Sequence, residues 1–306
     1  MESETNQYLL DEIRRLKHEK GAIILVHNYQ RPEIYQVGDF IGDSYGLSVE
    51  ASKTDARMIV FCGVHFMAES ASILNPDKKV ILPAIDAGCP MADMVTAEDL
   101  RELQKKHPGT ATVCYINTTA AVKAESDVIC TSSNAIKIVN SLPNKRVIFV
   151  PDKNLASYVS EQTDKEIIPW EGYCYVHARF SPEELAEAKK SLKGAKVIAH
   201  PECPGEVRKL ADHICSTSGM ISYAKNSEAK EFIVATEIGM IEMLKLHVPG
   251  KTFYTAPPGR TCVNMKKNNL LLVLDALKNE APVITVPEKI RVKAKRALDR
   301  MLEAGK

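Results

Sequence analysis

Residues 22–29, AIILVHNY, form an apolar run that ends in polar side chains, and the whole chain is built on this pattern. Such a run favours a buried strand of a parallel sheet. Two later stretches have the same design and end in Tyr115-Ile116-Asn117 and His200-Pro201-Glu202. His27, Asn117 and His200 are 90 and 83 residues apart. The spacing predicts three related units, each too long, at about 86 residues, for a solenoid repeat.

Two more sets of residues recur in the same phase. Polar turns that open expected helices contain one set, separated by 88 and 85 residues: Ser44, Ser132 and Thr217. Single cysteines beyond strands form the other, separated by 85 and 88 residues: Cys89, Cys174 and Cys262. A threefold duplication of a small α/β domain accounts for all three sets. The alternative is chance similarity between segments of an alternating α/β chain.

The expected architecture is α/β: three pseudo-threefold-related α/β/α domains with small parallel sheets around a central cavity. Apolar β-rich runs separated by helical segments give four strands per unit. The expected strands are 22–26, 39–41, 57–62 and 80–83; 112–116, 127–130, 146–150 and 166–169; 196–199, 213–215, 231–235 and 252–255. The expected domains are residues 1–93 with 281–306, residues 94–179, and residues 180–280.

Helices connect and close these units. A helix over residues 7–20 is expected to stop at Gly21, and others are expected to begin after Thr96 and after Ser181, where Ser-Pro-Glu-Glu is a capping-box pattern. A long helix over 265–279, a strand over 282–286 and a helix over 288–303 follow Cys262. The last two are expected to complete the sheet of the first unit.

The composition excludes several classes of partner. Forty basic and 39 acidic residues leave a net charge of +1 with no long run of either sign, so neither nucleic acid nor anionic membrane is an expected partner. The acidic, polar first seven residues lack the pattern of a secretory signal. No apolar run reaches the roughly 18 residues of a membrane span. The expectation is a cytoplasmic protein.

The eight cysteines divide into two groups. A disulfide framework is not expected in the cytoplasm, because that compartment keeps thiols reduced. One group lies in or at the end of apolar runs and is expected to be inert core thiols: Cys62, Cys114, Cys130 and Cys215. The other lies among glycine, proline and polar residues: Cys89, Cys174, Cys203 and Cys262. Of these, only Cys203 is out of phase with the repeat.

Three loop cysteines from three units suit an iron–sulfur cluster, because thiolates are its normal ligands. A cubane with three protein ligands leaves one iron open to act as a Lewis acid on substrate oxygen. No compact C-x-x-C pair is present, so structural zinc and unligated thiols remain alternatives.

The polar residues at strand ends and helix starts predict the substrate site. Ligands of parallel sheets bind beyond the carboxyl ends of strands, where His27, Tyr29, Asn117, His200 and Glu202 fall. Helix starts offer free N–H groups and favour anions. Three such turns suit a substrate with several carboxylate or phosphate groups, with ordinary helix capping by serine or threonine as the alternative.

The whole chain resembles the quinolinate synthase family. The matching motifs are His27-Asn28-Tyr29-Gln30, Gly42-Asp43-Ser44, Phe66-Met67-Ala68-Glu69, Leu74-Asn75-Pro76-Asp77-Lys78, Cys89-Pro90-Met91-Ala92, Cys130-Thr131-Ser132-Ser133-Asn134-Ala135, Pro151-Asp152-Lys153-Asn154-Leu155, His200-Pro201-Glu202-Cys203-Pro204, Thr236-Glu237-Ile238-Gly239-Met240 and Cys262-Val263-Asn264-Met265-Lys266. Ser133, His65 and residues 178–180 depart from the family pattern, which affects only local packing.

The resemblance implies three analogous domains around a [4Fe–4S] cluster. It also implies condensation of iminoaspartate with dihydroxyacetone phosphate into quinolinate, phosphate and water, on the route to NAD. An aspartate oxidase or dehydrogenase would supply the imine. The implied sequence is carbon–carbon bond formation with loss of phosphate, a carbonyl shift, ring closure by the amine, and dehydrations.

The resemblance also assigns residues. The implied cluster ligands are Cys89, Cys174 and Cys262. The implied substrate contacts are His27, Ser44, Tyr115, Ile116, Asn117, Ser132, His200, Pro201, Glu202 and Thr217. The catalytic assignments are Tyr29, Tyr115, His200 and Glu202. Glu202 with His200 is the first expectation for the acid/base pair, because a carboxylate beside an imidazole can move protons near neutral pH.

Two other functions remain open from the residues. A cluster-dependent hydro-lyase acting on a small hydroxy acid would also use an open iron, but would not need phosphate-binding turns. A cluster or zinc protein that senses iron or oxygen would not need a buried polar cavity.

Overall fold

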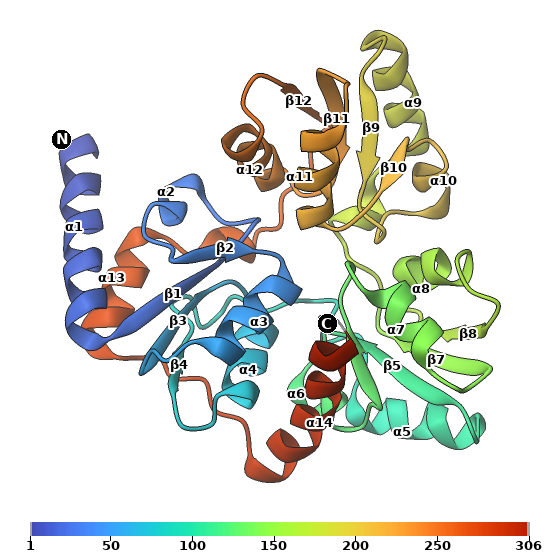
Figure 1. Cartoon of the computed structure of the whole chain (residues 1–306), viewed down its shortest axis with the longest axis horizontal. Helices are drawn as coiled ribbons and strands as arrows, with labels where there is room; N and C mark the ends of the chain where they lie inside the picture. The colour runs from blue at the N-terminus through green and yellow to red at the C-terminus, as the bar shows by residue number, and fades with distance from the viewer. Residues whose placement is uncertain (1, 305–306) are drawn as a thin grey trace.

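Three small parallel sheets make up the protein, which is described by a computed structural model over residues 2–304. In each sheet the first strand of the unit lies between the second and the third, and the fourth pairs with the third: β2-β1-β3-β4, β6-β5-β7-β8 and β10-β9-β11-β12. Within the described residues, all pairs of neighbouring strands in the three sheets are parallel, and each sheet is flanked by helices (Figure 1). The predicted fold class is confirmed.

The strands are β1 (Ala22–His27), β2 (Phe40–Gly42), β3 (Met58–Cys62), β4 (Lys79–Ile81), β5 (Ala111–Tyr115), β6 (Val128–Cys130), β7 (Arg146–Val150), β8 (Glu166–Pro169), β9 (Lys196–Ala199), β10 (His213–Ile214), β11 (Glu231–Ala235) and β12 (Thr252–Thr255). The α-helices are α1 (Glu2–Lys20), α2 (Pro32–Tyr35), α3 (Ser44–Lys53), α4 (His65–Leu74), α5 (Ala97–Lys106), α6 (Ala120–Ala124), α7 (Ala135–Ser141), α8 (Lys153–Ser160), α9 (Pro182–Ser191), α10 (Gly205–Arg208), α11 (Thr217–Asn226), α12 (Gly239–His247), α13 (Leu270–Asn279) and α14 (Glu288–Ala304). Two 3₁₀ turns are η1 (His177–Arg179) and η2 (Met265–Lys267).

The threefold repeat extends to individual hydrogen bonds. An aspartate just before the second strand of each unit accepts a backbone N–H from the first strand. Asp39 accepts from Ile24 at 2.8 Å, Asp127 from Thr112 at 2.7 Å, and Asp212 from Val197 at 2.9 Å. An aspartate makes the same hydrogen bond in each sheet, which argues against chance similarity between the units.

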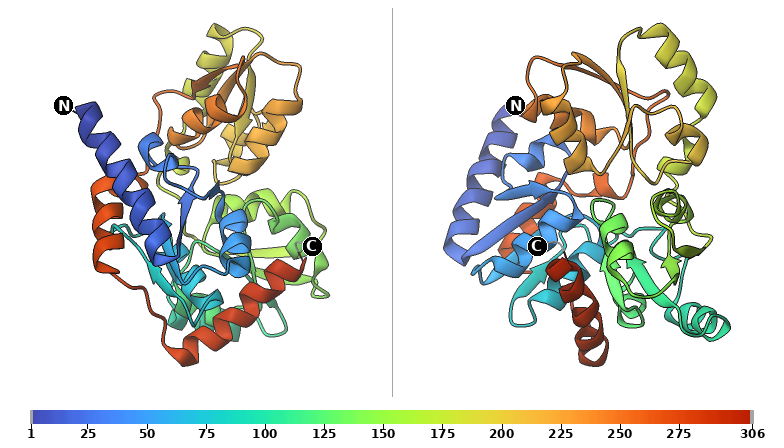
Figure 2. Two further views of the ribbon diagram at one scale, coloured as in Figure 1. Left: turned by 60° about the vertical axis from the view of Figure 1, so that its left-hand side comes forward. Right: turned by 45° about the vertical axis from the view of Figure 1, so that its right-hand side comes forward.

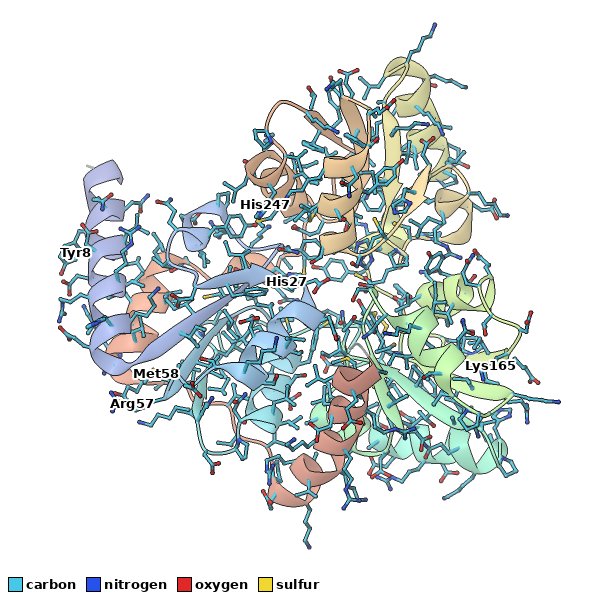
Figure 3. The ribbon with its side chains drawn as sticks, viewed as in Figure 1. Tyr8, His27, Arg57, Met58, Lys165 and His247 are labelled. Atoms are coloured by element: carbon cyan, nitrogen blue, oxygen red, sulfur yellow. The ribbon has the colours of Figure 1, made fainter. Side chains whose placement is uncertain are left out.

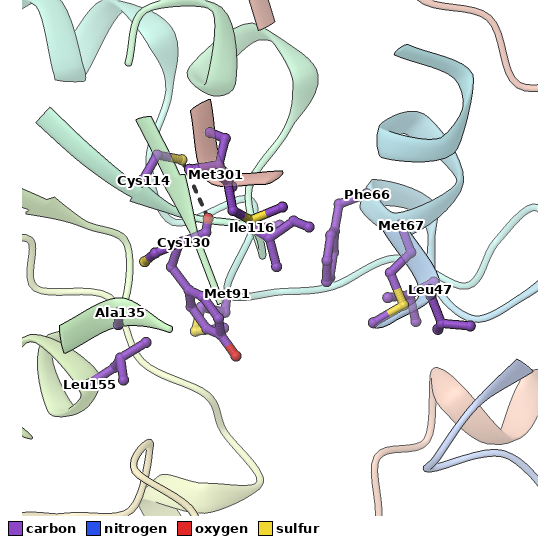
Figure 4. Packing of buried hydrophobic residues seen from close by; sticks show 14 of the residues in the cluster. Leu47, Phe66, Met67, Met91, Cys114, Ile116, Cys130, Ala135, Leu155 and Met301 are labelled. Atoms are coloured by element: carbon purple, nitrogen blue, oxygen red, sulfur yellow. Dashed lines mark hydrogen bonds between the residues drawn. The ribbon is translucent and has the colours of Figure 1, made fainter. Parts of the chain in front are cut away.

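The three units surround a common centre, as Figures 1 and 2 show. One buried apolar core runs through all of them. In Figure 4, Phe66 of α4 lies between Met67 and Leu47 of the first unit and Ile116 and Cys130 of the second. A continuous core of this kind holds the sheets in a set arrangement, since sliding one unit would expose apolar surface.

The predicted helix starts are confirmed at both positions. Thr96 forms a capping box with Asp99 before α5. The Ser181 hydroxyl accepts the N–H groups of Glu183 and Glu184 at the start of α9. Cys62, Cys114 and Cys130 are buried in the core as predicted, whereas Cys215 is half-buried.

The predicted helix over 265–279 is wrong in its first turn. Residues 265–267 form η2, the chain then becomes extended at Asn268, and α13 begins at Leu270. The side chain of Asn269 accepts the N–H of Leu272 at 3.0 Å, and that of Asn268 donates to the carbonyl of Gly63 at 2.9 Å. The side chain of asparagine competes with the helix for backbone hydrogen bonds and favours a cap position. Asn268 therefore ends η2, and Asn269 caps the start of α13.

The predicted strand over 282–286 is reduced to one antiparallel bridge between Ile81 and Val283. Pro282 accepts from Leu82 but has no N–H to extend the ladder. The following helix, α14, packs against α6 and β6 of the second unit as well as against α4. Because α14 contacts two units, the assignment of residues 281–306 to the first domain stays a prediction. The other two domain boundaries also stay predictions.

Some expectations involve residues that the structure does not describe. The expected first domain includes Met1 and residues 305–306, which lie outside the described residues. Met1 is also the first residue of the polar N-terminal segment. Within residues 2–304, no helix combines the length and the apolar character needed to cross a membrane.

Candidate active site

One cavity lies where the three units meet, beyond the carboxyl ends of their first strands. β1 ends at His27, β5 ends at Tyr115, and His200 directly follows β9. Figure 3 places His27 close to this meeting point. The cavity is lined by twelve of the residues predicted from the sequence: His27, Tyr29, Ser44, Cys89, Tyr115, Asn117, Ser132, Cys174, His200, Glu202, Thr217 and Cys262. Ile116 and Pro201 are buried but do not line it.

The three cysteines occupy equivalent places in their units. In each unit a residue beyond the third strand donates its N–H to a carbonyl two residues before the cysteine. The donors and acceptors are His65 and Ala87 at 2.8 Å, Lys153 and Gly172 at 2.8 Å, and Ile238 and Arg260 at 2.9 Å. The repeat therefore brings the cysteines to one cavity because each follows the same turn of the same fold.

A chain of polar side chains in close contact crosses all three units at the cavity, and all of its members except Thr236 line the cavity. The Tyr29 hydroxyl lies 2.6 Å from Thr236 Oγ1, which lies 2.8 Å from His177 Nε2. His177 Nδ1 lies 2.7 Å from Glu202 Oε2, and the Tyr115 hydroxyl donates to Glu202 Oε1. All five side chains are buried. Such a chain can pass protons between groups on opposite sides of a substrate.

Two members of this chain, His177 and Thr236, are absent from the sequence-based site. Glu202 was expected to act with His200, but His200 Nδ1 is 3.9 Å from its carboxylate and His177 is the nearer imidazole. The available signals were the position of His177 three residues after Cys174 and the place of Thr236 in a matched motif. Neither identifies a partner, because these residues come together only in the folded chain.

His27 and His200 are held as neutral hydrogen-bond donors. Burial, together with Lys266 near His27 and His177 near His200, lowers both pKa values to about 3. Their Nδ1 atoms accept the N–H groups of Tyr29 at 3.2 Å and Glu202 at 3.3 Å. The proton of each neutral ring is therefore on Nε2, which can donate to a substrate oxygen without carrying charge.

Glu202 and the two tyrosines are held in opposite protonation states. Burial alone would raise the pKa of Glu202. The nearby imidazoles of His177 and His200 and the hydrogen bonds from His177 and Tyr115 together outweigh burial, so the pKa of Glu202 is lowered. Burial raises the pKa values of Tyr115 and Tyr29 well above their ordinary value. Near neutral pH the site thus pairs an ionised acceptor with protonated donors.

The neutral histidines predict that acid destabilises the fold. Above pH 6.5 both histidines are neutral in the folded and in the unfolded chain. Between pH 6.5 and about 3, the unfolded chain binds protons at these histidines and the folded chain does not. Each histidine should therefore lower the free energy of unfolding by up to about 1.4 kcal/mol per pH unit. Thermal unfolding of metal-free protein between pH 7.5 and 5 measures this slope.

His27→Asn, which cannot titrate, should make the pH dependence of the melting temperature shallower. His18→Asn, on the exposed face of α1, is the matched control and should keep the wild-type slope. Equal slopes in His27→Asn and wild type would contradict the assignment of a buried neutral imidazole.

The turns expected to bind anions have hydroxyls that do not cap their own helices at two of three positions, although Thr217 Oγ1 accepts a hydrogen bond from Asn28 Nδ2 at 2.9 Å. Asp43 caps α3 and Ser216 caps α11, so Ser44 and Thr217 are the first helical residues and do not act as caps. Ser132 lies three residues before α7, which Asn134 precedes. Ordinary capping is therefore wrong for Ser44 and Thr217. Their helix starts face a cavity whose described lining contains neither lysine nor arginine.

The donor set of the cavity fits a metal centre. Cys89, Cys174 and Cys262 are free, half-buried thiols that line one cavity, and thiolates are common metal ligands. Among the described residues, the only group whose ligand atoms all lie within 4.8 Å of one another is Cys174, His177 and Glu202. The three sulfurs do not form such a group, so they do not all lie within 4.8 Å of one another.

These features define a class: three-unit α/β proteins whose units share one central cavity, lined by apolar side chains and a few convergent polar ones, an arrangement typical of enzymes that act on small molecules. Residues 11–303 match the family model described as quinolinate synthetase A protein. The chain is 55% identical over 294 residues to quinolinate synthase of Methanoregula boonei, covering 96% of this chain and 97% of that protein. It is 56% identical over 291 residues to that of Geobacter metallireducens, covering 95% and 96%. The chain therefore belongs to the quinolinate synthase family.

Proposed function

We propose that this protein is a quinolinate synthase that condenses iminoaspartate with dihydroxyacetone phosphate to quinolinate, phosphate and water. The observation that carries the proposal is the convergence, in one cavity, of three loop cysteines, two helix starts with non-capping hydroxyls and an acid–base chain. The full-length match to family members named for this activity supports it. The protein would act in NAD biosynthesis in the cytoplasm, with the imine supplied by an aspartate oxidase or dehydrogenase.

Cys89, Cys174 and Cys262 would hold a [4Fe–4S] cluster. When bound, the cluster would supply a Lewis acid that assists the loss of hydroxide. The fit rests on three half-buried free thiols at equivalent positions around one cavity.

The protein residues would bind the substrate anions and move protons. Ser44 and Thr217 would donate hydroxyl and backbone N–H groups to phosphate or carboxylate, and Ser132 would add a third hydroxyl. The Nε2 protons of His27 and His200 would orient carbonyl or carboxylate oxygens. Asn117 Oδ1, which is buried without a partner, would accept from the substrate amine or a hydroxyl.

Proton transfers would use the buried chain at its two ends. Glu202 would accept a proton from carbon or nitrogen, and Tyr115 would donate one to an oxygen nearby. Tyr29 would do the same on the far side of the cavity and recover its proton through Thr236 and His177. The ring-forming steps require several such transfers without access of bulk water, which the burial of these groups favours.

Ser44→Ala should weaken binding of the anionic substrates more than it slows chemistry. Loss of one hydroxyl donor to an anion costs about 1.5–3 kcal/mol, so KM for the substrate held there should rise roughly 10-fold or more with a smaller change in kcat. Steady-state kinetics with each substrate varied in turn identifies the anion concerned. Ser52→Ala, on the exposed side of α3, is the matched control. An unchanged KM for both substrates would contradict this role.

A second candidate is a mononuclear metal site formed by Cys174, His177 and Glu202, whose ligand atoms already lie close together. This donor set suits zinc. Such a site would use one of the three repeat cysteines and leave Cys89 and Cys262 without a role. The metal content of the protein decides between the two.

The test is anaerobic purification, analysis of iron, sulfide and zinc, and an assay of quinolinate from the two substrates. About four irons and four sulfides per chain, with quinolinate formed only when both substrates are present, are expected. Stoichiometric zinc without sulfide would favour the mononuclear site. Cluster without quinolinate, but with turnover of a hydroxy acid, would favour a hydro-lyase.

A further inference from the structure

Two buried carboxylates outside the predicted site contact the backbone of two of the cysteine loops, and one of them, Glu237, also lines the cavity. Asp152 follows β7 and Glu237 follows β11, and their side chains are 0% and 1% exposed. Burying a carboxylate is costly unless hydrogen bonds or charges compensate it. Their contacts therefore indicate what these residues are retained for.

Each carboxylate connects the start of a helix to the backbone of a cysteine. Asp152 accepts the N–H of Leu155 in α8 at 2.7 Å and that of Cys174 at 3.0 Å. Glu237 accepts the N–H of Gly239 in α12 at 2.6 Å and that of Cys262 at 3.1 Å. The two residues thus do the same task in the second and third units.

The first unit lacks this device. Val64 occupies the equivalent place, because it directly precedes His65, whose N–H binds the carbonyl of Ala87, two residues before Cys89. It is an apolar cap residue without a side-chain hydrogen bond to α4, and it offers no acceptor to the N–H of Cys89. The three cysteine positions are therefore alike in backbone and unlike in charge.

A carboxylate in this place has two physical effects on a bound cluster. It fixes the backbone of the cysteine, and so the direction from which its sulfur approaches the metal. It also occupies an N–H that could otherwise bond to the thiolate. Its negative charge is the other effect. Burial raises the pKa of Asp152, but both of its oxygens accept backbone N–H groups, which favours the ionised form. Glu237 is paired with Lys266 at 3.2 Å, so replacing it with a neutral residue leaves that cation unbalanced beside the loop. Hydrogen bonds to cluster sulfurs and the net charge nearby set the reduction potential, and negative charge disfavours the gain of an electron.

We propose that Asp152 and Glu237 are positioning residues for the metal centre: they hold the loops of Cys174 and Cys262 in binding geometry and make the bound cluster harder to reduce. This inference rests on the proposed [4Fe–4S] cluster. A cluster that serves as a Lewis acid has no use for an extra electron, so carboxylates behind its ligands suit a non-redox role.

Two kinds of substitution separate the effects. Asp152→Asn and Glu237→Gln remove the charge and one of the accepted hydrogen bonds. Glu237→Asp keeps the charge but shortens the reach to Cys262 by one methylene. Asp127→Asn is the matched control, because Asp127 also accepts a strand N–H in the second unit but lies away from the cavity.

The measurements are the midpoint potential of the cluster, by electron paramagnetic resonance during reductive titration, and the rate of iron release to a chelator. In Asp152→Asn and Glu237→Gln, the ratio of reduced to oxidised cluster at a fixed potential should rise about tenfold, a shift of about 59 mV for one electron. Iron release should be faster in both. Glu237→Asp should release iron faster while keeping the wild-type potential, and Asp127→Asn should match wild type in both.

The outcomes distinguish this inference from the proposed function. Wild-type potential and wild-type iron release in both Asp152→Asn and Glu237→Gln, with a normal cluster content, would overturn the inference alone. If either of these variants fails to fold, Glu237→Asp can still be compared with wild type. A raised potential or an unchanged rate of iron release in Glu237→Asp would also overturn the inference. A wild-type protein that binds no cluster overturns both proposals.

Discussion

Cys174→Ala is expected to abolish the metal centre and to lower quinolinate formation about 1000-fold or more. The reason is that two remaining thiolates cannot hold a cluster that three units surround, and loss of the Lewis acid removes several kcal/mol of transition-state stabilisation. Cys89→Ala and Cys262→Ala should behave in the same way, since all three cysteines follow equivalent turns. Iron and sulfide analysis with visible absorption spectra of anaerobic protein measures the cluster, and a quinolinate assay measures the activity.

Cys203→Ala provides the control within the same chain. Cys203 is also a free thiol in a loop, but it is fully buried, does not line the cavity and contacts the carbonyl of Ala235 at 3.4 Å. This variant should keep both the cluster and the activity. A wild-type cluster content in Cys174→Ala, or loss of the cluster in Cys203→Ala alone, would contradict the assignment of the ligands.

Glu202→Gln is expected to lower kcat by about 100- to 10,000-fold while leaving the cluster in place. Glutamine retains the shape and one acceptor oxygen, but it cannot take up a proton between His177 and Tyr115. The lowered pKa of Glu202 keeps its carboxylate ionised throughout the neutral range in the wild type. The amide of glutamine does not titrate in that range, so no change of pH should restore the variant. Rates under saturating substrate, together with iron content, separate loss of chemistry from loss of the metal centre.

Glu206→Gln is the matched control, because Glu206 lies four residues away on the surface and pairs only with Lys209. It should retain wild-type kcat. If the buried chain acts as one unit, Thr236→Val should lower kcat, and adding Tyr29→Phe should cost less than the sum of the two separate effects. A kcat within about threefold of wild type in Glu202→Gln would remove this residue from the catalytic assignment.

The repetition in the sequence was enough to predict the three sheets. Strands in fully covered parallel sheets appear as continuous apolar runs, and these runs are separated here by helical patterns with caps at Thr96 and Ser181. The convergence of Cys89, Cys174 and Cys262 on one cavity also follows from their spacing, since equivalent loops of related units lie at equivalent edges. Where the sequence failed, local chemistry outweighed periodicity, as at Asn268 and Asn269, which interrupt the expected helix.

The pairing of side chains could not be read from the sequence. Glu202 and His200 are neighbours along the chain, and this proximity suggested an acid/base pair, but the structure brings His177 closer from another segment. Asp152 and Glu237 belonged to matched motifs without an evident task. Their task depends on where the backbone N–H groups of Cys174 and Cys262 come to lie.

By itself the sequence determined the fold class, the threefold organisation, the positions of the three cysteines and twelve of the residues that line the cavity, because these depend on patterns that repeat along one chain. Only the tertiary structure decided which carboxylate meets which imidazole, which residue relays a proton to Tyr29, and which cysteine backbones are held by charge. These contacts join residues between 22 and 207 positions apart. Hydrogen bonds are short and directional, so they are set by the packing of the three units on one another.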